Sequence, residues 1–139
     1  MDDSFVMHIA SEQHILAVRH AIRELVNQRL QFNSLERMHV ITAVSELVRN
    51  IYNYAKEGDV EAKIVLSPAG KKGIRIKFAD HGPGILDIEK AMQPKSIREF
   101  GKGMGIGLSG SKKLADEFSI ESQPGLGTTI IWTRWERYG

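Results

Sequence analysis

The 139-residue chain contains no cysteine, only four prolines and no long apolar run. The lack of cysteine excludes disulfides, thiolate-bound zinc and cysteine nucleophiles, and it fits a reducing compartment. No apolar run approaches the ~20 residues needed to span a bilayer, so no membrane helix is expected. The acidic start, Met1 to Ser4, lacks the apolar region of a signal peptide. We therefore expect a cytoplasmic protein with no membrane partner.

An excess of charge of one sign is also missing. The formal net charge is +2, from 19 Lys and Arg against 17 Asp and Glu. This is too small to favour nucleic acid, and the chain has neither a basic stripe nor a groove-reading motif, so no nucleic-acid partner is expected. Hydrophobic residues make up 42% of the chain, an ordinary value for a soluble globular protein. The length suits one domain over residues 1–139 with a single core.

Hydrophobic periodicity and turn residues predict the element order β-α-α-β-β-loop-α-β-β. Because strands and helices mix without strict alternation, an α+β fold is favoured over a doubly wound parallel sheet. Asn33 and Glu36 have the spacing of a capping box for the second helix, and a turn is expected at Gly58 and Asp59. The expected strands are 5–10, 60–66, 73–79, 118–122 and 128–135, and the expected helices are 12–30, 34–56, 88–92 and 105–117.

Two helices show an apolar face at helical spacing. We expect the first to bury Ile15, Val18, Ile22, Leu25 and Val26, and the second to bury Leu35, Met38, Ile41, Val44, Leu47, Val48 and Ile51. On the other side of the second helix, Glu46 and Asn50 are four residues apart, so their side chains lie one turn apart on one face. A carboxylate and an amide at this spacing can hold Mg²⁺ and its waters, although the pair alone also fits a solvated helix face.

An aspartate ends the second strand of the predicted hairpin. Asp80 is followed by His81, Gly82 and Gly84, and glycines let the backbone approach a flat ligand closely. A buried carboxylate at this position could accept a hydrogen bond from an exocyclic amine, which distinguishes adenine from guanine. Taken alone, the segment also fits an ordinary turn, because Asp, Gly and Pro are common turn residues.

A glycine-rich loop precedes the third expected helix. It contains Gly101, Gly103, Gly105, Gly107 and Gly110. Such a loop presents free backbone N–H groups, and the helix that follows favours anions at its start. Two other phosphate loops are excluded. The match to G-x-G-x-x-G over 105–110 lacks the preceding strand of a dinucleotide fold, and the P-loop ending Gly-Lys-Ser/Thr is replaced by Gly-Ser-Lys.

The four motifs over 46–50, 80–84, 101–107 and 125–129 occur in an order that resembles the GHKL ATPases. The likeness covers nearly the whole chain. It implies the Bergerat fold, a two-layer α/β sandwich with a mixed sheet covered on one face by helices. Within that family the chain is most similar to the small bacterial switch serine/threonine kinases of partner-switching systems. The segments 45–52, 71–73, 80–85 and 116–119 carry this likeness, and Arg49 before the asparagine is the most useful discriminator.

The resemblance implies ATP and Mg²⁺ as cofactors and gives roles to matching residues. Glu46 would be the general base or orient the metal, and Asn50 would coordinate Mg²⁺. The remaining residues divide between the base and the phosphates: Asp80 would bind the adenine amine, Gly82 and Gly84 would shape that pocket, Thr128 would support a water beside Asp80, and Gly103, Gly105 and Gly107 would wrap the phosphates. The roles of Lys95, Arg98, Gly101 and Lys102 stay open.

The resemblance also implies partners. The substrate would be a serine or threonine of a STAS-domain antagonist in a stress or regulatory pathway, and a PP2C-type phosphatase or a stressosome scaffold would be an alternative partner. Two other functions stay open: an anti-sigma factor with serine kinase activity, and a nucleotide-dependent binding module that activates a phosphatase. A histidine kinase is not expected, because His14 and His20 lie on a helix that is needed to cover the sheet.

Overall fold

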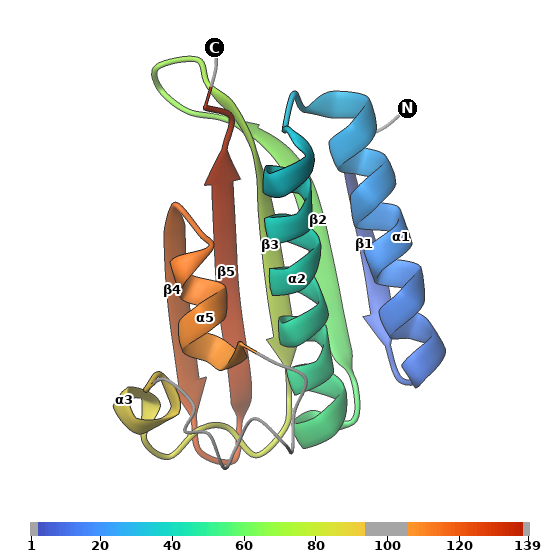
Figure 1. Cartoon of the computed structure of the whole chain (residues 1–139). Coiled ribbons are helices and arrows are strands. Elements are labelled where there is room, and N and C mark those ends of the chain that lie inside the picture. Colours follow the sequence, from blue (N-terminus) through green and yellow to red (C-terminus); the bar gives the residue numbers. More distant parts are fainter. Residues whose placement is uncertain (1–2, 94–105, 138–139) are drawn as a thin grey trace.

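The computed structural model describes residues 3–93 and 106–137 and places them in two layers. In chain order the elements are β1 (Ser4–Ile9), α1 (Glu12–Arg29), α2 (Ser34–Asn50), the π-helix η1 (Ile51–Ala55), β2 (Gly58–Leu66), β3 (Lys72–Asp80), α3 (Ile88–Ala91), α5 (Gly107–Lys113), β4 (Glu117–Gln123) and β5 (Gly127–Trp135). The strands form one sheet, and α1, α2 and α5 lie on one face of it (Figure 1). The expected α+β class and the coverage of one face by helices are confirmed.

The strand order is β1-β2-β3-β5-β4, and each neighbouring pair is antiparallel. The expectation of a mixed sheet is therefore wrong for the strands described. The reason is the pair of helices between β1 and β2. α1 runs back along β1 and α2 reverses the direction once more, so β2 enters the sheet antiparallel to β1 (Figure 1). The remaining strands form two hairpins, β2–β3 and β4–β5, with β5 lying between β3 and β4.

The two long helices begin and pack largely as their sequences indicate. The expected face of α1 is confirmed, because all five of its named residues are buried. The capping box of α2 is also confirmed: Asn33 Oδ1 accepts from the Glu36 amide over 2.8 Å, and Glu36 Oε1 accepts from the Asn33 amide over 2.9 Å. The expected face of α2 is partly wrong, since Leu35 and Met38 are 55% and 56% exposed. Val44, Leu47 and Val48 are buried as expected, and Val40 and Ala43 complete the buried face of α2.

The end of α2 differs from the expectation of one helix up to residue 56. The α-helix ends at Asn50 and continues as η1, and Lys56 then reverses the chain in the left-handed region at φ 71°. The turn expected at Gly58 and Asp59 is wrong, because both residues belong to β2. π-Helical turns are rare in proteins, and those that occur are often found at functional sites. Here η1 brings its last residues beside the end of β3.

A buried indole holds α5 against the sheet. Trp132 of β5 is fully buried, and its Nε1 donates to the Ser111 carbonyl oxygen over 2.9 Å. The Ser111 hydroxyl donates to the Gly107 carbonyl oxygen over 2.9 Å. α5 is shorter than expected because the Asp116 amide already bonds to the Thr133 carbonyl oxygen of β5, which begins strand pairing. Across the described ranges, no helix has the length and apolar character that crossing a membrane requires.

Candidate nucleotide-binding site

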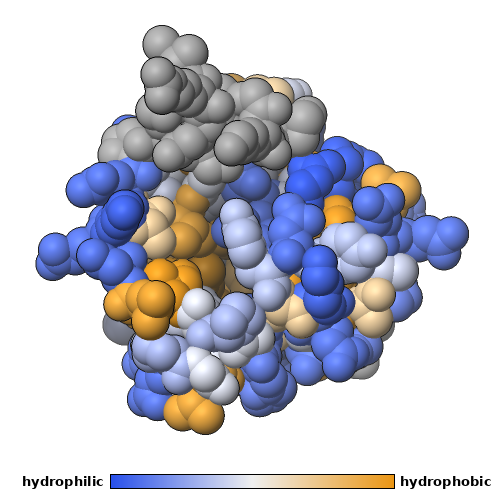
Figure 2. Space-filling view, turned by 90° about the horizontal axis from the view of Figure 1, so that it is seen from below, coloured by the Kyte–Doolittle hydropathy of each residue, from blue (hydrophilic) through white to orange (hydrophobic). Residues whose placement is uncertain are grey.

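A cavity of about 370 Å³ lies at the end of the sheet where α2 passes into η1. Its volume falls in the range of small-molecule sites, ~300–1,000 Å³. Figure 2 views the molecule from this end and shows hydrophobic residues gathered around a hollow. Most of its wall is apolar, formed by Leu47, Ile51, Tyr54, Ala55, Phe78, Pro83, Ile85, Ala91, Leu108 and Ile130. Such walls suit a flat ring system, whose orientation must then be set by a few polar groups.

Asp80 is the acidic residue of this wall, and two backbone amides fix its position. It is the last residue of β3, and its Oδ1 accepts from the Gly82 amide over 2.9 Å and from the Thr128 amide over 3.3 Å. The other carboxylate oxygen has no hydrogen-bond partner within the ranges 3–93 and 106–137. Asp80 therefore offers the cavity a positioned acceptor, which is what recognition of an exocyclic amine requires.

The two glycines after Asp80 have different roles. Gly84 lines the cavity at φ +75°, a conformation that favours glycine, and a side chain there would overlap the Gln123 carbonyl oxygen. Gly82 lies against η1, where an added Cβ would be only 2.5 Å from the Cβ of Ala55. Gly84 thus shapes the cavity wall directly, whereas Gly82 allows the turn to pack under that wall.

A hydroxyl pair supports the cavity from β4 and β5. Thr128 lines the cavity, and its Oγ1 lies 2.8 Å from the Ser122 Oγ. Ser122 accepts from the Ile85 amide over 2.7 Å and donates to the Gly127 carbonyl oxygen over 3.1 Å. Ser122 has only one hydroxyl proton. When Ser122 donates that proton to the Gly127 carbonyl oxygen, Thr128 must be the donor in the hydrogen bond between the two hydroxyls. Sequence reasoning missed Ser122, which only the β4–β5 register brings opposite Thr128.

The carboxylate and amide of α2 lie one turn apart, as expected, but they line different hollows. Asn50 lines the cavity of Asp80. Glu46 is 7% exposed and lines a separate hollow of about 270 Å³ together with Arg19, Ile41, Thr42, Ser45, Arg49 and Ile106. A hydrogen bond links the two hollows, because Glu46 Oε1 accepts from the Gly107 amide over 3.0 Å and Gly107 lines the cavity. Glu46 thus lies at the boundary between them.

Two glycines of the loop are described: Gly107 begins α5 at φ 65°, and Gly110 lies within the same helix. Gly103 and Gly105 lie outside the described residues, as do Lys95, Arg98, Gly101 and Lys102. Within the described ranges, His, Cys, Asp and Glu form no group of three or more that could hold a metal ion. Asn50 lines the cavity, and a side-chain amide oxygen is a ligand type that Mg²⁺ accepts.

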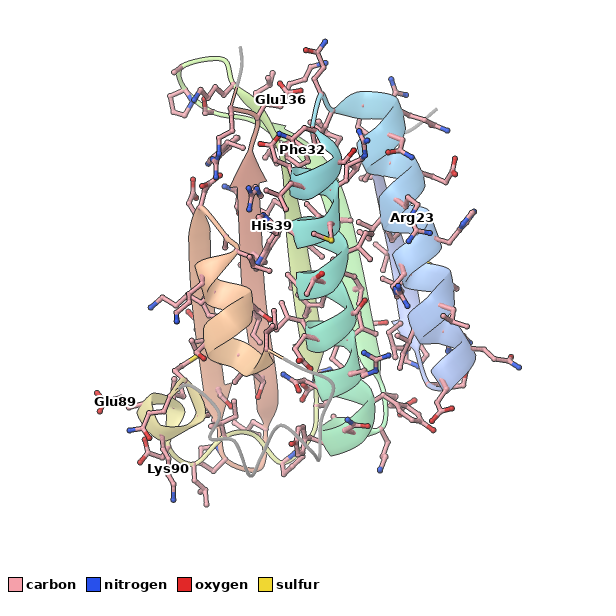
Figure 3. All side chains as sticks on the ribbon, in the orientation of Figure 1. Arg23, Phe32, His39, Glu89, Lys90 and Glu136 are labelled. Carbon is pink, nitrogen blue, oxygen red and sulfur yellow. The ribbon has the colours of Figure 1, made fainter. Side chains whose placement is uncertain are left out.

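The opposite end of α2 carries a buried polar group of a different kind. His39 projects from α2 toward β5 (Figure 3), and burial together with the Arg134 guanidinium lowers its pKa. Glu36 and Arg134 are also buried there, and Arg134 donates to the Leu114 carbonyl oxygen over 2.8 Å. None of His39, Glu36 and Arg134 lines the cavity of Asp80. The group joins α2, α5 and β5 and is not part of the ligand site.

Comparisons with known proteins identify the family of this chain. Residues 9–135 match the model of the histidine kinase-like ATPase domain. The chain is 40% identical over 137 residues to the serine/threonine-protein kinase RsbT of Bacillus subtilis strain 168, covering 99% of this chain and 100% of that protein. It is 42% identical over 98 residues to the anti-sigma F factor of Thermoanaerobacter sp. strain X514, covering 68% and 66% of the two chains.

A solved structure shares the fold. The crystal structure of the RsbU and RsbW domains of Rv1364c from Mycobacterium tuberculosis matches with a TM-score of 0.61 and 22% identity. The match covers 96% of this chain and 33% of that one. At this level of identity the likeness shows the arrangement of the sheet and helices alone.

Proposed function

This chain belongs to the histidine kinase-like ATPase domain family, and on that premise we propose that the cavity of Asp80 holds the adenine of ATP during phosphate transfer to another protein. The protein is a serine/threonine-protein kinase of the partner-switching type. The observation that carries the proposal is the environment of Asp80. One carboxylate oxygen is fixed by two backbone amides and the other is available to a ligand, in a wall that is otherwise mostly apolar.

The remaining groups divide between the base and the phosphates. Adenine lies between the apolar walls and donates its amine to Asp80, while Thr128 and Gly84 complete that part of the cavity. The phosphates extend toward Asn50 and Gly107. Mg²⁺, when bound, would neutralise phosphate charge, and Asn50 is the side chain that would hold it. Gly103 and Gly105 would add backbone N–H groups for the phosphates.

Glu46 acts on the acceptor hydroxyl and does not contact the adenine. Its carboxylate is buried beside Gly107 but faces the neighbouring hollow. The acceptor hydroxyl approaches from that hollow, and Glu46 orients it and takes its proton. The hydroxyl oxygen bonds to the γ-phosphorus, the bond from that phosphorus to the β–γ bridging oxygen breaks, and ADP leaves. Positioning and charge stabilisation supply most of the catalysis in such a transfer.

The substrate we propose is a serine or threonine of a STAS-domain antagonist. The full-length similarity to a serine/threonine-protein kinase supports transfer to another protein. A PP2C-type phosphatase or a stressosome scaffold is the proposed alternative partner, consistent with partner switching. An anti-sigma factor with kinase activity is the second candidate, because 98 residues are 42% identical to an anti-sigma F factor.

The experiment is incubation of the chain with γ-labelled ATP, Mg²⁺ and a STAS-domain protein encoded beside its gene. We expect label on a serine or threonine of the STAS protein, located by mass spectrometry. Reactions that lack this chain provide the control for background labelling. Label on His14, His20 or another residue of this chain, with none on the STAS protein, contradicts the proposal.

A further inference from the structure

A groove between α1 and α2 extends away from the nucleotide cavity and begins at the hollow beside Glu46. It consists of the hollow of about 270 Å³ beside Glu46 and an adjoining one of about 400 Å³. The two hollows share Arg19, Ile41 and Thr42 in their linings, so they lie side by side along α1 and α2. We call the two together the arginine groove. The larger hollow is completed by Arg23, Val26, Asn27, Ser34, Arg37 and Met38.

The charge of the groove is one-sided. Four arginines line it: Arg19, Arg23, Arg37 and Arg49. The single acidic residue of its lining is Glu46, at the inner end. Among the residues that the structure describes, Arg19, Arg23 and Arg49 form no ion pair, and the Nε of Arg19 is buried without a hydrogen-bond partner. Arginines gathered in this way attract acidic groups and donate hydrogen bonds to carboxylates.

The groove also offers apolar surface between its charges. Met38 is 56% exposed, and Ile41 and Val26 lie beside it in the lining. Figure 3 shows Arg23 on α1, where it is exposed to solvent. A lining of arginines around methionine and isoleucine suits a protein segment that carries both acidic and apolar side chains.

The position of the groove connects it to phosphate transfer. Its inner end is the carboxylate of Glu46, which is bonded to the Gly107 amide at the edge of the nucleotide cavity. A segment of a partner protein lying in the groove would therefore reach Glu46, whose carboxylate takes the hydroxyl proton under the proposed function. No other cavity described here combines free arginines with contact to Glu46.

We infer that the arginine groove binds an acidic segment of the protein substrate and delivers its acceptor serine or threonine to Glu46. The inference rests on the proposed kinase function and adds the docking surface and the charge of the partner to it. Charge favours this occupant over a second copy of the chain, because a two-fold contact would place the arginines of both copies together. It also disfavours nucleic acid, whose phosphates would meet the carboxylate of Glu46 at the inner end.

The test measures steady-state phosphorylation of the STAS-domain protein by three variants. Arg23→Glu reverses an exposed charge in the groove, and Thr42→Trp fills the point that both hollows share. Lys63→Glu, on β2 at the opposite face of the sheet, makes the same charge change elsewhere and serves as the matched control. All three positions are exposed, so the fold should be retained.

We expect Arg23→Glu to raise the KM for the STAS protein about tenfold, because repulsion replaces attraction at the interface. Thr42→Trp should raise this KM similarly. In both variants, kcat at saturation and Mg-ATP affinity should stay near parental values. The Lys63→Glu variant should keep the parental KM. The KM of the parent should rise with salt, and more steeply than that of Arg23→Glu.

Parental phosphorylation with unchanged KM in Arg23→Glu and Thr42→Trp overturns the groove inference alone. Absence of phosphorylation by the parent overturns the proposed function instead. Sedimentation distinguishes the other occupants: a parental dimer that Thr42→Trp dissociates would show that a second copy fills the groove. A duplex DNA probe that binds the parent more tightly than the STAS protein does would likewise contradict the inference.

Discussion

The nucleotide cavity and the arginine groove differ in the charge and polarity of their linings. The cavity is mostly apolar and contains one positioned carboxylate, Asp80, whereas the groove is lined by four arginines around a few apolar side chains. The former suits a flat ring with an exocyclic amine, and the latter suits acidic protein. Glu46 lies between them and is bonded to the Gly107 amide. The difference teaches that one helix, α2, can separate nucleotide binding from acceptor binding by presenting Asn50 and Glu46 to different spaces.

The largest expected effect comes from the residue at the boundary. Glu46→Gln keeps an oxygen that can accept from the Gly107 amide but removes the carboxylate that acts as the general base. Phosphate transfer should fall by about 10²–10⁴-fold, the usual contribution of general-base catalysis. Mg-ATP affinity, measured by calorimetry, should stay near the parental value. Glu61→Gln, an exposed change on β2, is the matched control, and transfer by Glu46→Gln at the parental rate would refute the assigned role.

The next effect belongs to the cavity alone. In Asp80→Asn, the amide oxygen can keep the bonds to Gly82 and Thr128, while the NH₂ group meets the adenine amine with two donors and no acceptor. ATP affinity should fall by about tenfold to a hundredfold, since an unpaired buried polar group costs ~1–3 kcal/mol. The ratio of ATP to GTP affinity should narrow as well. Asp59→Asn on the outer sheet face is the control, and unchanged ATP affinity in Asp80→Asn would argue against adenine recognition there.

Asn50→Ala should have a smaller and metal-dependent effect. Removing the amide that we assign to Mg²⁺ should weaken Mg-ATP binding by about tenfold, the lower limit for residues that support a metal site. Affinity for metal-free nucleotide should change much less. Asn53→Ala on η1, the π-helix that follows α2, is an exposed control. Equal losses with and without Mg²⁺ would assign Asn50 to the nucleotide and not to the metal.

The smallest effect tests a region outside both hollows. Hydrogen bonds from His8 to Asp59 (2.9 Å) and to Glu57 (3.2 Å) raise the pKa of His8 above its ordinary value of 6.5. A raised pKa means that the stabilisation is complete below about pH 6.5 and is lost as the pH rises through the folded-state pKa. The Tm of the parent should therefore fall slightly more between pH 6 and pH 8 than the Tm of His8→Gln. Identical pH profiles would show that these exposed bonds contribute nothing.

The sequence alone predicted the parts of this account that depend on local patterns. The capping box of α2, the buried stripe of α1 and the place of Asp80 at a strand end follow from spacing over a few residues, and the structure has them. The likeness to GHKL ATPases supplied the roles that spacing cannot give. The cavity then brought together Asn50, Asp80, Gly84, Gly107 and Thr128, which lie far apart in the sequence.

Other features depend on packing between distant elements and could not be read in advance. Met38 lines the hollow between α1 and α2 and is exposed there, whereas the amphipathic pattern alone assigned it to the core. The partnership of Ser122 with Thr128 needs the register of β4 and β5. The separation of Glu46 from Asn50 depends on Gly107 and Ile106, which reach α2 from the far end of the sequence. The direction of β2 depends on how two helices reverse the chain.

The most direct test of the central claim is calorimetric titration of the parent chain with Mg-ATP and with Mg-GTP under the same conditions. If Asp80 accepts a hydrogen bond from the adenine amine, GTP should bind at least ~100-fold more weakly, because a site built around one polar group rejects a ligand that lacks its partner. Equal affinities for the two nucleotides would contradict the placement of adenine against Asp80 and, with it, the separation of nucleotide binding from acceptor binding.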